Sequence, residues 1–117
     1  MSVNAVEIQT SFGPADTAPI TFGENNNRII RYLQAIPMDS TNGAPAALAA
    51  DVTYTIFVNG VSVGTIVVTA AGGAAPVFTL LTPAVALKQN DCVAISPSIA
   101  AGVGRAVGLN LLGEEPN

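Results

Sequence analysis

The sequence predicts an all-β fold, a single-domain antiparallel β-sandwich or jelly roll. Helix signals are nearly absent, because apolar residues alternate or run together and glycine and proline interrupt almost every segment. Six to eight short segments of strand character follow one another with turns between them, as in sandwiches and jelly rolls. The length of 117 residues fits one domain, since a second core would leave both halves too small to be stable.

The first third of the chain contains two expected strands. One is expected over Val3 to Thr10, before glycine and proline break the pattern, and the other over Arg28 to Ile36. Strict alternation in the second strand predicts two faces, one with Ile30, Tyr32 and Ile36 and the other with Ile29, Leu33 and Ala35. The Ala-, Gly- and Pro-rich stretch from Met38 to Ala50 is interpreted as a long crossover loop.

The clearest unit is a hairpin over Asp51 to Thr69. Val52, Tyr54, Ile56 and Val58 share one face of its first strand, and Val61 to Thr69 forms the second. Between them stands Asn59-Gly60, and both central residues of a type I′ turn need positive φ. Asn59 and Gly60 are therefore the predicted hairpin turn.

The last third of the chain again contains expected strands separated by turns. Strands are expected over Pro76 to Thr82, Val85 to Lys88 and Cys92 to Ser96, with a turn at Asn90 and Asp91. Gly102 and Gly104 mark a loop before a final strand, Arg105 to Leu112, whose inner face carries Val107, Leu109 and Leu111.

Composition restricts the partners. Half of the residues are hydrophobic and 10% are charged, against roughly a quarter charged in typical soluble domains. This composition favours burial of apolar surface in an oligomer. A net charge of −4, with four scattered basic residues, argues against nucleic acid. No run is long enough to span a membrane, and Met1 to Thr10 lacks signal-peptide character, so we expect no membrane insertion and synthesis in the cytoplasm.

Catalytic chemistry has little support. The chain has no histidine, which excludes His-based triads, and we expect no enzyme and no cofactor. The lone Cys92, beside Val93 and Ile95, is interpreted as an inert buried thiol. The carboxylates are scattered; Asp39, Asp51 and Asp91 lack calcium-ligand spacing, so no metal is expected. The run from Gly102 to Gly108 leaves too few following residues for a dinucleotide-binding unit.

A sugar-binding role is the open alternative. Asn25 to Asn27 form a polar loop before a strand, and the loops Gly23 to Asn27 and Ala71 to Pro76 are candidates to contact a cell-surface glycan. Tyr32 and Tyr54 could line a carbohydrate platform, but residues in alternating strands are more often core or interface residues.

The second half also resembles a known family. The runs TYTIFVNGVSVGTIVVT and FTLLTPAVALKQNDCVAISPSIAAGVGRAVGLNLL give a strand entering Asn-Gly-Val, an alternating Val/Thr strand, a turn with Asp before an apolar strand, and a glycine loop before the last strand. This order is similar to the trimeric jelly-roll heads, of the tumour necrosis factor-like fold, of phage head fibres, capsid decoration proteins and collagen-like spore-surface proteins. The family usually has Gly-Asp at the turn where this chain has Asn90-Asp91, and Asn also tolerates positive φ.

The resemblance covers Arg28 to Leu112 and implies a homotrimer without chemistry that attaches to a larger assembly. We therefore expect a virion structural protein on the capsid surface, a capsid decoration (cement) or short head-fibre protein, with the major capsid protein or another virion component as partner. The alternative is a receptor- or glycan-binding tip. Residues 1–27 are then an attachment arm and 28–117 the jelly-roll head. The candidate attachment residues in the arm are Val3, Val6, Ile8 and Phe12.

Overall fold

The computed structural model describes residues 3–24 and 26–116, which form an all-β sandwich. The alternation of apolar and polar residues along each segment favours strands with one face inward. The strands are β1 (Val3–Phe12), β2 (Ile20–Gly23), β3 (Arg28–Asp39), β4 (Val52–Val58), β5 (Val61–Val68), β6 (Val77–Leu87), β7 (Cys92–Pro97) and β8 (Arg105–Pro116).

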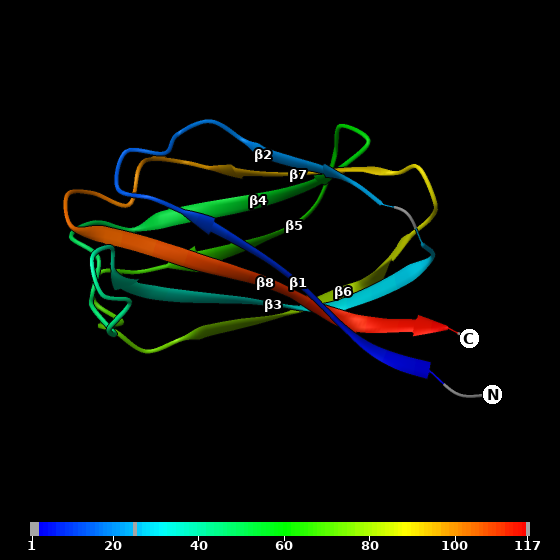
Figure 1. Cartoon of the computed structure of the whole chain (residues 1–117), viewed down its shortest axis with the longest axis horizontal. Helices are drawn as coiled ribbons and strands as arrows, with labels where there is room; N and C mark the ends of the chain where they lie inside the picture. The colour runs from blue at the N-terminus through cyan, green and yellow to red at the C-terminus, as the bar shows by residue number, and fades with distance from the viewer. Residues whose placement is uncertain (1–2, 25, 117) are drawn as a thin grey trace.

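The strands form two four-stranded antiparallel sheets packed face to face (Figure 1). One sheet has the order β1-β8-β3-β6 and the other β2-β7-β4-β5. Except at the β4–β5 hairpin, consecutive strands lie in opposite sheets. This is the strand order of a jelly roll, and it confirms the predicted fold class.

The core fills the space between the sheets. In β4 and β8, the residues that strand alternation predicts to face inward are buried. They include Val52, Tyr54 and Ile56 of β4 and Val107, Leu109 and Leu111 of β8. The rings of Phe12 and Tyr54 pack at 5.1 Å between centroids. Burial raises the pKa of the Tyr54 hydroxyl to about 12, because desolvation disfavours the phenolate.

The N-terminal segment is part of both sheets. The expected strand over Val3 to Thr10 is present as β1, which pairs with β8 along its whole length, and β2 pairs with β7. A boundary at residue 27 therefore does not separate an arm from the head in the described structure. The reason is that Phe12 of β1 is a core residue, which ties this strand to the sandwich.

Residues 77–87 form one strand instead of the two predicted over Pro76 to Thr82 and Val85 to Lys88. Both halves pair with β3, on either side of an irregularity in that strand. Pro83 lies in the irregular middle of β6, and the chain does not reverse there. The expected crossover loop after Met38 begins later, because β3 continues to Asp39 and Met38 bridges to Pro45.

In the described part of the chain, no helix has the length and apolar character needed to cross a membrane.

Candidate functional site

A β-bulge at Arg31 organises the outer face of the β1-β8-β3-β6 sheet. Ile30 is opposite Gly113 of β8, and Tyr32 is opposite the adjacent residue Leu112, so Arg31 is an extra residue in β3. An inserted residue reverses the alternation of side chains beyond it. The predicted grouping of Ile30 with Tyr32 is therefore wrong: Ile30 and Leu33 are both buried, whereas Tyr32 is 46% exposed on the outer face.

Gly113 permits the bulge. A Cβ atom at this position would overlap the carbonyl oxygen of Ile29 and lie 2.9 Å from the Cα atom of Ile30. Real Cβ atoms do not approach backbone so closely, and glycine is the residue that allows such contact. Beside Tyr32 and Gly113 the outer face has a depression.

This depression, hereafter the bulge hollow, is an open cavity of about 390 Å³ over β1, β8 and β3. Its lining combines one aromatic ring, one guanidinium group, two carboxylates and small or aliphatic residues. The lining residues are Ala5, Glu7, Arg31, Tyr32, Leu112, Gly113 and Glu114.

Arg31 and Glu114 form the polar wall of the bulge hollow. The Nε atom of Arg31 donates to Oε1 of Glu114 at 2.6 Å, and Nη2 forms an ion pair with the same oxygen. On the β1 side, Nε2 of Gln9 donates to Oε1 of Glu7 at 2.7 Å. Because the Arg31 side chain is about half exposed, this ion pair adds little stability. It fixes the position of the guanidinium group.

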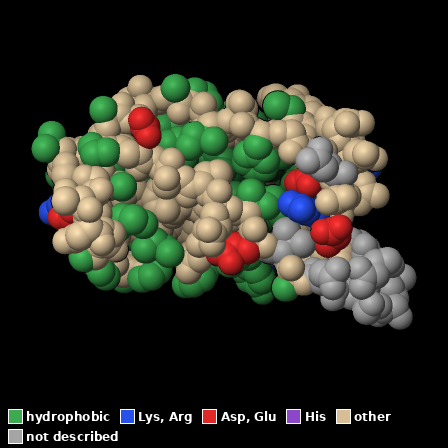
Figure 2. All heavy atoms as spheres, viewed as in Figure 1, with side chains coloured by type: hydrophobic (Ala, Val, Ile, Leu, Met, Phe, Trp, Pro, Cys, Tyr) green, Lys and Arg blue, Asp and Glu red, His purple; other side chains and the backbone are tan. Residues whose placement is uncertain are grey.

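The apolar side of the face lies toward β6. Pairing places Leu80 of β6 beside Tyr32 and Phe78 beside Gln34. Phe78 is 61% exposed and Leu80 55%. Since β6 ends the sheet, these two side chains form an apolar edge, hereafter the β6 edge. On the face seen in Figure 2, charged side chains are sparse and lie among uncharged and hydrophobic atoms.

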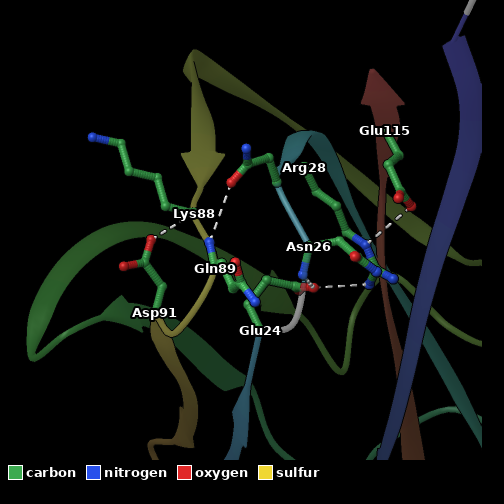
Figure 3. A network of polar contacts seen from close by, with 8 residues as sticks. Glu24, Asn26, Arg28, Lys88, Gln89, Asp91 and Glu115 are labelled. Carbon is green, nitrogen blue, oxygen red and sulfur yellow. Dashed lines mark hydrogen bonds and ion pairs between the residues drawn. The ribbon is translucent and has the colours of Figure 1, made fainter. Parts of the chain in front are cut away.

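The first of the two predicted glycan loops, Gly23 to Asn27, is held by a network of polar contacts (Figure 3). The backbone N–H of Glu24 donates to the Asp91 carbonyl at 2.9 Å, and the N–H of Gln89 donates to Oδ1 of Asn27 at 3.2 Å. The buried Glu24 carboxylate pairs with Nη1 of Arg28 at 3.4 Å. Asn25 lies outside the described residues. These contacts give the loop a structural role at the sandwich end.

The chain turns at Asn59-Gly60 and at Gln89-Asn90, one residue before the predicted Asn90-Asp91, and the two turns lie against each other. Asn59 and Gly60 have φ values of 51° and 84°, and Asn90 has 75°. Nδ2 of Asn59 donates to Oδ1 of Asp91 at 3.0 Å, and Oδ1 of Asn59 accepts from the Cys92 N–H. The pKa of Asp91 is lowered, first by a hydrogen bond from the Lys88 N–H and then by this contact with Asn59.

The candidate attachment residues occupy different environments. Phe12 is completely buried, and Ile8 is half-buried against the core. The side chains of Val3 and Val6 lie outside the described residues. Because a core side chain is not available to a partner, Phe12 anchors the strand, and the attachment role of this segment stays a prediction.

Cys92 is exposed, and the prediction of a buried thiol is wrong. The inward positions of β7 are Val93, Ile95 and Pro97, so the first residue of the strand points outward. Of the two tyrosines, Tyr54 is a core residue and Tyr32 is exposed. Within residues 3–24 and 26–116, no group of three His, Cys, Asp or Glu side chains gathers as metal ligands.

The chain matches no family model and no curated protein. Among solved structures, it is similar to a carbohydrate-binding module, CBM36, in complex with calcium and xylotriose, with a TM-score of 0.54 and 14% identity over 97% of this chain and 93% of that chain. A structure of Desmodium yellow mottle tymovirus aligns with a TM-score of 0.41 and 8% identity, over 97% and 86% of the two chains. The likeness to the first concerns the fold, a two-sheet jelly roll.

Proposed function

We propose that this chain is a virion structural protein, a capsid decoration (cement) or short head-fibre protein that binds the capsid lattice as a homotrimer. The observation that carries this proposal is the β6 edge. Phe78 and Leu80 stand two residues apart on one face of an edge strand and are more than half exposed. Exposed apolar side chains on an edge strand are typical of a surface that another chain covers.

Composition and sequence pattern support the same function. The chain has few charges, and its order of strands and turns resembles trimeric jelly-roll heads of virion proteins. The proposal includes the absence of catalysis, because the chain has no histidine and the described carboxylates do not gather into a group of three. Binding through shape and buried apolar area needs none of these groups.

The test is copurification with assembled particles. A decoration or head-fibre protein is expected in a copy number that matches the symmetry of the capsid, and it should rebind particles that lack it. Phe78→Ser is expected to weaken both self-association and particle binding, with Val103→Ser as the matched control, since Val103 is 99% exposed on the β7–β8 loop, away from the β6 edge. Absence from particles, or a few copies confined to a tail, would contradict the proposal.

The second candidate is a receptor- or glycan-binding tip of a phage fibre or cell-surface appendage. The bulge hollow favours it, because an exposed aromatic ring stands there beside a positioned guanidinium group and two carboxylates. The two candidates use neighbouring surfaces, the β6 edge for assembly and the hollow for a ligand, so variants can separate them.

A further inference from the structure

The bulge hollow has the composition of a small-ligand site. Such sites combine an apolar surface with a few polar groups at fixed positions, and they commonly enclose 300–1,000 Å³. The hollow, at about 390 Å³, lies at the low end of this range and is open to solvent. It therefore suits part of an elongated ligand that lies across the strands.

The apolar contribution comes from Tyr32 and its neighbours. Ala5 and Leu112 line the hollow with it, and pairing places Leu112 beside Tyr32. An exposed tyrosine offers a rigid apolar ring with a polar hydroxyl at its end. A ligand that fits this arrangement has both a C–H surface and hydroxyl groups.

The polar contribution comes from Arg31, Glu114 and Glu7. A guanidinium group has five N–H donors, and Nε and Nη2 of Arg31 are engaged with Glu114, so further donors remain for a ligand. Each carboxylate has two acceptor oxygens, of which Oε1 of Glu7 already accepts from Gln9. Donors and acceptors at fixed positions match the hydroxyl groups of a polyol.

Charge restricts the ligand further. Among the described residues, the hollow carries one guanidinium group and two carboxylates, and the chain has a net charge of −4. Phosphate, nucleic acid and acidic sugars would meet repulsion that the single cation, already paired with Glu114, does not offset. A neutral ligand avoids this cost.

From these observations we infer that the bulge hollow is a binding site for a neutral oligosaccharide, with Tyr32 as the stacking residue and Arg31, Glu114 and Glu7 as the hydroxyl-binding residues. This inference deepens the second candidate function and names its ligand class. It does not depend on capsid binding, because the β6 edge and the hollow carry different side chains.

The experiment is an NMR titration of the isotope-labelled full chain with xylotriose, cellotriose, maltotriose and the acidic trisaccharide trigalacturonate. At about 10 mM sugar, Kd values in the millimolar range are detected. At least one neutral trisaccharide is expected to shift the amide signals of Tyr32, Leu112 and Gly113 saturably. Trigalacturonate is expected to bind more weakly.

Variants identify the site. Tyr32→Ala is expected to weaken binding roughly three- to tenfold, the effect of losing one aromatic contact, whereas Tyr32→Phe keeps the ring and stays within about threefold of the original affinity. Phe78→Ala is the matched control, since it removes an exposed aromatic residue outside the hollow and is expected to leave sugar binding unchanged while weakening self-association.

Three results would overturn the inference. They are no saturable shift with any neutral trisaccharide, tighter binding of trigalacturonate than of the neutral sugars, and unchanged binding in Tyr32→Ala. If Tyr32→Ala dissociates the oligomer and sugars have no effect, the hollow belongs to the interface between copies. Self-association is measured separately, with Phe78→Ala. A failure of the sugar-binding inference therefore leaves the assembly proposal testable.

Discussion

Gly113 of β8 lies directly against the backbone of Ile29 in β3, so close that a Cβ atom at position 113 would overlap the Ile29 carbonyl oxygen. This contact accompanies the bulge at Arg31, which places Tyr32 on the outer face, where it lines the hollow. The glycine is therefore a requirement of the candidate site.

Gly113→Ala is expected to destabilise the protein by about 3 kcal/mol, because neither backbone can move without breaking the pairing of β3 with β8. Denaturant unfolding measures the effect. Gly23→Ala is the matched control, since a Cβ atom there meets nothing within 4 Å, and it is expected to change stability by less than about 0.5 kcal/mol. Equal stability of the two variants would contradict the tight contact.

Gly60→Val is expected to destabilise by about 1 kcal/mol or more, because a β-branched side chain resists the φ of 84° at this position. Gly60→Asn serves as the control, since asparagine tolerates positive φ and should retain more of the stability. Thermal unfolding compares the two variants. If valine is tolerated as well as asparagine, the hairpin does not depend on this turn.

The sequence predicts the hairpin turn and the faces of regular strands because the residues that determine them are neighbours in the chain. Asn59-Gly60 stands between two β-branched runs. In the same way, the alternation of Val107, Leu109 and Leu111 along the chain is enough to indicate the inner face of β8. The bulge has no such local signal, because Arg31 becomes an extra residue only when β3 pairs with strands distant in sequence.

The candidate site was accordingly predicted only in part. Tyr32 is recognisable as a possible sugar platform, but regular alternation places it with the buried Ile30. Arg31 and Glu114 are far apart in sequence, and pairing of β3 with β8 brings them together. Gly113, following an apolar run, is the signal that could have indicated an irregular pairing.

Asp91→Asn is expected to lower stability at neutral pH and to have less effect in acid. Hydrogen bonds from the Lys88 N–H and the Asn59 side chain lower the pKa of Asp91 in the folded state. The carboxylate therefore contributes stability above its unfolded pKa of about 3.9, and this contribution is lost as the pH falls through the lower folded value.

Thermal unfolding of both proteins across this pH range measures the effect of Asp91→Asn. The difference in Tm is expected to narrow below about pH 4. A difference that is constant with pH would show that the carboxylate charge has no role in the turn.

Deletion of residues 2–24 is expected to abolish folding. The deletion removes β1 and β2, one strand from each sheet, together with the core residue Phe12. Circular dichroism and denaturant unfolding of the truncated chain check this result. A cooperative β-rich domain would show instead that residues 1–27 are a separable arm, and its binding to particles would then test the attachment role directly.

The central claim, assembly through the β6 edge, is tested most directly by the native mass of the full chain in solution. Light scattering at micromolar concentration is expected to give three times the chain mass. The double variant Phe78→Ser and Leu80→Ser is expected to give a folded monomer, because it removes the apolar area that holds the copies together. A monomeric mass for the unmodified chain, or an unchanged trimer in the double variant, would contradict this account.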